Sequence, residues 1–65
     1  MPETNLKRLR QAAGLTQKEL AEKSGVNLRT LQDYEQRKND INGIRLEAGL
    51  RIAKALNTDA KNLLE

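Results

Sequence analysis

Five residues between positions 27 and 33 share the spacing of one exposed helix face, and most of them carry hydrogen-bonding side chains. The set is Asn27, Leu28, Arg29, Gln32 and Asp33. At about 100° per residue, Arg29 and Asp33 lie nearly opposite Leu31 when Leu31 and Tyr34 form the buried side. A guanidinium, an amide and a carboxylate on one face offer donors and acceptors to a partner. The face therefore predicts that these side chains recognise a binding partner.

The composition argues against catalysis and against bound metals. The 65 residues include no histidine and no cysteine, so imidazole acid–base chemistry and thiolate ligation are excluded. Tyr34 is the only aromatic residue, whereas single-stranded nucleic acids are bound on several stacked aromatic faces. No apolar run approaches the roughly 20 residues of a membrane span. We therefore expect a cytoplasmic protein that is not an enzyme, with no cofactor, no metal and no membrane partner.

The positive charge is concentrated in the first part of the chain. Residues 1–38 contain eight Lys or Arg and five Asp or Glu, whereas residues 39–65 contain four of each. The whole net charge of +3 therefore belongs to the part that holds the recognition face. A solvated surface would explain a charge this small, but its uneven distribution favours an anionic partner.

Apolar residues recur every three or four positions throughout the chain, which predicts an all-α fold in a single domain, 1–65. Thr16 and Glu19 form the pattern of a capping box, Asn27 is a strong N-cap, and Gly14 is an expected helix stop. The expected helices cover residues 5–13, 17–23, 27–36, 45–56 and 59–64.

The fourth of these helices carries a glycine in its interior. Its expected buried face is formed by Leu46, Leu50, Ala53 and Leu56. Gly49 costs about 1 kcal/mol relative to alanine in a helix, and we expect the close approach of another helix to compensate. Asn57 is expected to end this helix, and Thr58 to cap the fifth.

Gly25 separates two helices that are too short to be stable alone. A turn of three to four residues with a glycine lets two helices cross at about 90–120°. We expect Gly25 to adopt positive φ, with the small Ala21 one turn earlier allowing close crossing. Leu20, Val26 and Leu31 would then point into the wedge between the helices, together with Tyr34.

These residues resemble the helix-turn-helix of the phage Cro/CI repressors and their bacterial relatives. The pattern Leu20-Ala21, Gly25-Val26, Leu31 and Tyr34 matches, as do "LKRLRQAAGLTQKELAEKSGV" and "LRIAKALNTDAKNLLE". The resemblance runs from Asn5 to Leu64 and implies a compact five-helix fold of the lambda-repressor type. Two features depart from the family: Ser24 occupies a usually apolar position, and the loop "RKNDINGIR" is longer than the common form.

The base-reading positions of the family fall on the recognition face already described. Arg29 can hold guanine O6 and N7, Gln32 can pair with adenine or bond a phosphate, and Leu28 can touch a thymine methyl. The alternatives are a solvated Arg29 and a Leu28 packed at the edge of the core. Asp33 is four residues from Arg29, and we favour a pair between these two side chains over a base contact.

Residues on either side of this face are expected to hold phosphates. They are Thr16, Gln17, Arg37, Lys38 and Asn39. The start of the second helix has free N–H groups and a partial positive charge, and the resemblance assigns Gln17 the role of a backbone clamp. A plain helix start and a solvated run of charges are the competing interpretations.

The resemblance also implies an ion pair between Arg10 and Glu35 that links the first helix to the third. Such a pair orients the reading helix more than it adds net stability. Two separate surface charges are the alternative.

The function expected from these features is sequence-specific binding of double-stranded DNA by a transcriptional repressor or regulator of bacterial or phage origin. A palindromic operator and a weak homodimer are expected with it, because dimers of this kind read two half-sites about one helical turn apart. The alternative is an antitoxin or another protein-interaction module on the same fold. A bundle that only packs around its glycine turn is the remaining non-functional interpretation.

Overall fold

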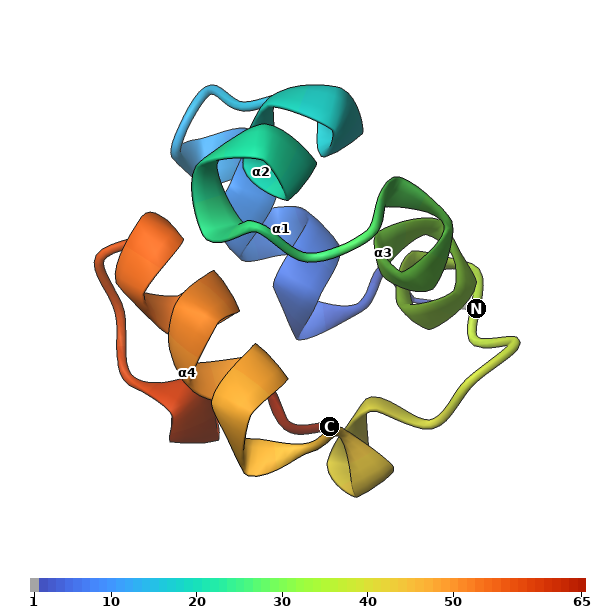
Figure 1. Ribbon diagram of the computed structural model, residues 1–65. Helices are drawn as coiled ribbons and strands as arrows, with labels where there is room; N and C mark the ends of the chain where they lie inside the picture. The colour runs from blue at the N-terminus through green and yellow to red at the C-terminus, as the bar shows by residue number, and fades with distance from the viewer. Residues whose placement is uncertain (1) are drawn as a thin grey trace.

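The computed structural model describes residues 2–65 as four α-helices and two short 3-10 helices (Figure 1). The α-helices are α1 (Asn5–Ala12), α2 (Gln17–Ser24), α3 (Leu28–Glu35) and α4 (Leu46–Ala55). The 3-10 helices are η1 (Ile41–Gly43) and η2 (Ala60–Leu63). No strand occurs in this part of the chain. None of its helices is long and apolar enough to cross a membrane.

The all-α prediction is confirmed, but the expected fifth α-helix is wrong, because residues 60–63 form η2 instead. Asp59 stands at the N-cap without a side-chain capping bond, and the Thr58 hydroxyl accepts from the Asn62 side chain. The Asn62 N–H bonds Asp59 three residues back, which gives the tighter winding. With Leu63 only 1% exposed, this short turn serves to place one side chain in the core.

The core joins one fully buried side chain from each of five elements. Leu6 of α1, Leu20 of α2, Leu31 of α3, Ile52 of α4 and Leu63 of η2 are at most 1% exposed. α2 packs against both α3 and α4, and η2 packs against α1 and α4. Figure 1 shows α1 in the middle of the view behind α2, with α3 on one side of it and α4 on the other. Each short helix therefore owes its stability to these tertiary contacts.

The turn between α2 and α3 has the backbone that its sequence predicts. Gly25 ends α2 at φ 74°, and its N–H bonds the Ala21 carbonyl. Val26 packs against the core as expected. Ser24, the polar residue at a usually apolar position, is only 8% exposed, and its hydroxyl accepts from the Val26 N–H at 3.2 Å. The serine thus stabilises the turn that an apolar residue would only pack against.

The expected buried face of α4 was wrong at two of its four positions. Leu46 is 74% exposed and Leu50 is 52% exposed, whereas Ala53 and Leu56 are buried as expected. The buried stripe runs through Gly49 and Ile52, which lie four positions before Ala53 and Leu56, respectively. Both stripes fit a helical repeat, so the packing of Ile52 into the core decides how the helix is rotated.

Gly49 does not meet another helix. A Cβ at this position would lie 3.6 Å from a methyl group of Ile44, which lies two residues before the helix begins, and that distance is an ordinary contact. Asn57 follows α4 in the left-handed region, at φ 55°, as a helix stop should.

We predict that Gly25→Ala lowers the free energy of unfolding by about 1 kcal/mol, which for a domain of this size lowers Tm by about 4–8 °C. The added Cβ would lie 3.8 Å from Arg51 and cause no clash, so the positive φ alone carries the loss. Thermal unfolding followed by circular dichroism measures it. An unchanged Tm would show that the turn tolerates a side chain.

We predict that the same substitution at Gly49 raises the stability of the fold instead of lowering it. Alanine fits beside Ile44, and it removes a helix-propensity cost of about 1 kcal/mol, so Tm should rise. A fall in Tm for Gly49→Ala would mean that Ile44 cannot accommodate the methyl group. Together, the two variants compare the effect of a glycine-to-alanine change at a positive φ with its effect inside a helix.

Candidate nucleic-acid interface

The recognition face lies on α3 and its N-cap, where Asn27, Leu28 and Arg29 are exposed and Gln32 and Asp33 are half-buried. Leu31 is 0% exposed on the opposite side, and Tyr34 packs against the core beside it. The Arg29 side chain is 75% exposed. Leu28 is 36% exposed and is not among the apolar residues that pack against the core. The face therefore presents a cationic and an apolar group to solvent side by side.

Arg29 and Asp33 lie within contact distance of each other. The Arg29 Nε donates to the Asp33 Oδ1 at 3.2 Å. The Asp33 side chain is 21% exposed, far less than that of Arg29. The carboxylate thus sits against the helix and holds one edge of a guanidinium whose other nitrogens reach further into solvent. Asp33 is placed to orient Arg29.

Asn27 lies at the start of this face, and Gln32 lies at its flank. The Asn27 Oδ1 accepts from the Arg29 N–H at 2.8 Å and so caps α3. This leaves the Asn27 amide nitrogen as the group that can donate to an external partner. Gln32 is half-buried at the flank.

The N-terminus of α2 is closed by the capping box. The Thr16 hydroxyl accepts from the Glu19 N–H at 3.0 Å, and the Glu19 carboxylate accepts from the Thr16 N–H at 2.9 Å. The bond from Thr16 lowers the pKa of Glu19. A phosphate here would meet the N–H groups of Gln17 and Lys18, next to a carboxylate that already occupies part of the positive helix end.

Arg37 differs from Lys38 and Asn39, the other expected phosphate-binding residues that follow α3, because its side chain is paired within the chain. Arg37 pairs with Glu65 at 3.0 Å and donates to the Pro2 carbonyl at 2.9 Å. The Asn5 N–H, and after it Arg37, lower the pKa of Glu65. Lys38 and Asn39 remain exposed, and their N–H groups close the end of α3 on the Asp33 carbonyl. Lys38 is thus the cation of this run that forms no ion pair within residues 2–65.

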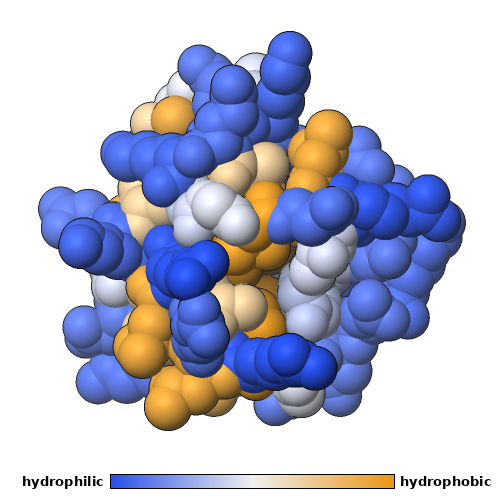
Figure 2. All heavy atoms as spheres, viewed as in Figure 1, coloured by the Kyte–Doolittle hydropathy of each residue, from blue (hydrophilic) through white to orange (hydrophobic). Residues whose placement is uncertain are grey.

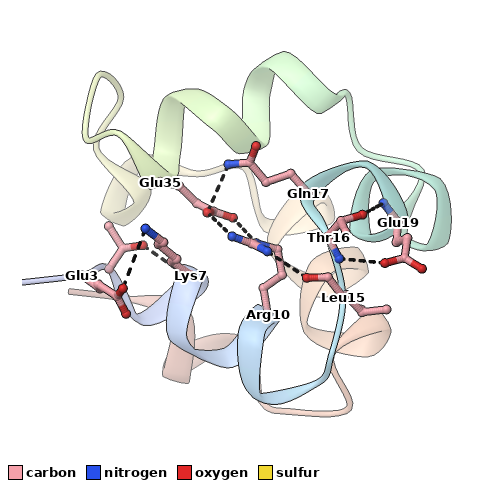
Figure 3. A network of polar contacts seen from close by, with 9 residues as sticks. Glu3, Lys7, Arg10, Leu15, Thr16, Gln17, Glu19 and Glu35 are labelled. Carbon is pink, nitrogen blue, oxygen red and sulfur yellow. Dashed lines mark hydrogen bonds and ion pairs between the residues drawn. The ribbon is translucent and has the colours of Figure 1, made fainter.

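Arg10 and Glu35 form a two-pronged ion pair between α1 and α3 (Figure 3). The Arg10 Nε lies 2.7 Å from the Glu35 Oε2, and its Nη2 lies 2.9 Å from Oε1. The Arg10 Nη1 donates to the Leu15 carbonyl at 2.8 Å. The side chains are 11% and 3% exposed, and the hydrogen bond to Glu35 raises the pKa of Arg10. Both buried groups of this pair are held by more than one hydrogen bond, which offsets the cost of burying their charges.

Gln17 joins this pair, a contact that the sequence did not indicate. Its Nε2 donates to the Glu35 Oε1 at 3.2 Å, across 18 positions of the chain. Figure 3 shows Gln17 reaching from the start of α2 toward Glu35 and Arg10. An amide nitrogen has two hydrogens, so one bond to Glu35 leaves a second donor for an anion. The contact fixes the start of α2 relative to α3.

Arg45 and Arg51 are cations that the sequence reading left out. They line a shallow hollow with Gly25, Val26 and Thr30, where α4 passes the turn before α3. No spacing in the sequence signals this, because the two arginines reach α3 only through packing of α4 on α2. Within residues 2–65, no group of three or more metal-ligating side chains is placed to hold an ion.

We predict that Arg10→Ala and Glu35→Ala are strongly non-additive in a double-mutant cycle. Each single change leaves a buried charge without its partner and should cost about 3–5 kcal/mol, and the coupling should exceed about 0.5 kcal/mol. Urea unfolding of the two single variants and the double variant measures it. Arg29→Ala and Asp33→Ala provide the control, since exposed pairs four residues apart couple by about 0.3–0.5 kcal/mol. Additive losses at Arg10 and Glu35 would exclude direct coupling.

The comparisons with known proteins agree with this geometry. The sequence matches the family model described as helix-turn-helix over residues 6–62. Neither the comparison with curated proteins nor that with solved structures gave a match. The match spans most of the chain and includes the turn at Gly25, the recognition face on α3 and the Arg10–Glu35 pair. The chain therefore belongs to the helix-turn-helix family of Cro/CI type, whose members are DNA-binding transcription regulators.

Proposed function

We propose that this protein is a repressor that reads the major groove of double-stranded DNA with α3. The observation that carries the proposal is the exposed side of α3, where Arg29 stands opposite the fully buried Leu31. A major groove about 12 Å wide admits one helix. Asn27, Leu28, Gln32 and Asp33 would accompany Arg29 into it.

Arg29 is the proposed reader and Asp33 its positioning residue. An arginine that holds guanine O6 and N7 needs both of its donors aimed in one plane. The bond from Nε to Asp33 restrains the guanidinium while its terminal nitrogens remain free for the base. Asp33 also partly neutralises Arg29, which weakens its non-specific attraction to phosphates. Leu28 would contact a thymine methyl beside the guanine.

Phosphate contacts would fix α3 in the groove from two sides. Gln17 offers its second amide hydrogen on the α2 side, and Lys38 offers its ammonium at the other end of α3. Asn39 would contribute through its side-chain amide. The Thr16 N–H is already bonded to Glu19, so Thr16 would contribute only through its place at the N-terminus of α2. Arg37 is the weakest member of the expected set, because Glu65 already neutralises it.

The Arg10–Glu35–Gln17 network would hold these two sides in register. α2 supplies the phosphate contact and α3 the base contact, and Glu35 bonds residues from α1 and α2 at the C-terminal end of α3. Two copies on a palindromic operator would place their α3 helices about 34 Å apart. One domain measures 25 Å at its widest, so two copies fit on successive major-groove faces.

We predict that Arg29→Ala combined with Asp33→Ala reduces the sequence preference. The double variant should lose about 1–3 kcal/mol on a selected site and little on random DNA, and it leaves no unpaired Asp33 to repel phosphates. Selection from random duplexes followed by titration at two salt concentrations measures both effects. A double variant that keeps its full preference would show that α3 is not the reading element.

Lys38→Ala and Arg37→Ala are matched controls for this experiment. Lys38→Ala should weaken binding alike on all sequences and reduce the salt slope by about one. Arg37→Ala should reduce the slope by less, since its charge is paired with Glu65. Equal slopes for the wild type and Lys38→Ala would remove Lys38 from the interface.

A further inference from the structure

The chain leaves α3 through a residue whose backbone conformation is unusual for its type. Arg37 has a φ of 61°, in the left-handed region where a Cβ is crowded and where helices most often place glycine. Asn57 is the other non-glycine residue of positive φ within residues 2–65, and asparagine tolerates this region better than arginine does. A conformation of this kind persists where surrounding contacts enforce it, so the contacts of Arg37 are the feature to explain.

The left-handed conformation closes the end of α3 as a Schellman motif. The Arg37 N–H bonds the Tyr34 carbonyl at 3.2 Å. The Lys38 N–H bonds the Asp33 carbonyl at 2.8 Å, and the two bonds together define the motif. Hydrophilic side chains cover the right-hand side of the molecule in Figure 2, where α3 and the segment after it lie. The backbone of Arg37 thus decides where Lys38 stands on this surface.

Two contacts from distant parts of the chain hold the Arg37 side chain. Its Nη2 lies 3.0 Å from the Glu65 Oε1, and the same nitrogen donates to the Pro2 carbonyl at 2.9 Å. A guanidinium fixed in this way restrains the backbone that carries it. The two contacts therefore supply at this helix end the support that a glycine would not need.

Glu65 is itself fixed from several sides, which makes it a firm support for Arg37. The Asn5 N–H, at the start of α1, donates to the Glu65 Oε2 at 2.8 Å. The Glu65 N–H donates to the Asn42 Oδ1 of η1 at 2.9 Å, and Figure 1 shows this end of the chain beside η1. Leu63, two positions earlier, is only 1% exposed. The carboxylate thus connects the start of α1 to the residue that follows α3.

We propose that Glu65 is a positioning residue for the phosphate contact of Lys38. It acts through Arg37, because the ion pair stabilises the left-handed backbone and this backbone directs Lys38. The inference rests on the proposed function above, in which Lys38 holds a phosphate at one end of α3. In this arrangement Arg37 contributes mainly its conformation, and its charge is used within the chain.

A purely electrostatic role for Glu65 would have the opposite effect on DNA binding. Glu65 would then only neutralise Arg37, and its removal would free one more cation for phosphates and steepen the salt dependence. Positioning predicts instead that the share of Lys38 in the salt dependence falls when Glu65 is removed. This share is measured as the change that Lys38→Ala causes within one background, so the altered net charge cancels.

The test measures how much Lys38→Ala reduces the salt slope of binding to one selected duplex. The reduction should be about one in the wild type, and about half of that or less in a Glu65→Ala background. Adding Arg37→Gly to the Glu65→Ala background should return the reduction to about one, because glycine adopts positive φ without support from a side chain.

Glu47→Ala is the matched control background. It also removes a surface carboxylate that pairs with an arginine, because the Glu47 Oε1 lies 2.6 Å from the Arg51 Nη2, but it does so on α4. The charge change is the same as in Glu65→Ala. Lys38→Ala should therefore reduce the salt slope by about one in this background, as in the wild type.

Amide hydrogen exchange tests the positioning in the free protein, without DNA. Glu65→Ala should speed exchange of the Lys38 N–H at least about tenfold, as expected when one hydrogen bond opens locally. The Leu31 N–H, which bonds the Asn27 carbonyl within α3, should keep its wild-type rate. Adding Arg37→Gly should restore the protection of Lys38. Equal acceleration at Leu31 and Lys38 would mean general destabilisation and would contradict the proposal.

Other results would also overturn the proposal. They are equal effects of Lys38→Ala in the wild type and in Glu65→Ala, unchanged exchange of Lys38 in Glu65→Ala, and a failure of Arg37→Gly to restore either quantity. A wild-type salt slope that Lys38→Ala leaves unchanged would remove the phosphate contact and count against the proposed function. Selective exchange of Lys38 in Glu65→Ala would then place the failure in the DNA contact and not in the support of the turn.

Discussion

The ion pair between Arg10 and Glu35 is the contact on which the arrangement of the proposed site depends. Glu35 is the last residue of α3, and its carboxylate accepts from Arg10 of α1 and Gln17 of α2. Arg10 also holds the Leu15 carbonyl in the link between α1 and α2. Three helices of eight residues, none stable alone, are thereby tied at one point. A buried pair of this kind adds little net stability and mainly selects one arrangement.

The remaining features of the site follow from that arrangement. Gly25 sets the angle at which α3 leaves α2, and Leu31 anchors the inner side of α3 in the core. Arg29 must then face outward, and Asp33 restrains it there. The same carboxylate that orders the helices also holds Gln17, so the proposed phosphate contact and the proposed base contact share one rigid support. Glu35 therefore connects the arrangement of the helices to the proposed DNA contacts.

Charge is used locally in this molecule. Arg37 is paired with Glu65, Arg29 with Asp33, and Arg51 with Glu47, so three of the twelve cationic side chains are held by neighbouring carboxylates at the surface. Exposed pairs like these contribute little to stability. Seven of the twelve Lys and Arg side chains, Lys38 among them, form no ion pair within residues 2–65 and can attract an anionic polymer without regard to its sequence. Pairing thus restrains individual arginines such as Arg29 and leaves the net charge of +3 unchanged.

The sequence alone determined the local features, because capping boxes, N-caps and glycine stops act within a few residues. It predicted the turn at Gly25, the starts of α2 and α3, and the side of α3 that faces outward. Long-range packing decided the rest. The rotation of α4 was ambiguous, because two apolar stripes fit the same repeat and only the burial of Ile52 selects one. The bond from Gln17 to Glu35 and the pairing of Arg37 with Glu65 join residues 18 and 28 positions apart, and no local pattern encodes such distances. The tertiary structure therefore decided which of the candidate residues are exposed and unpaired.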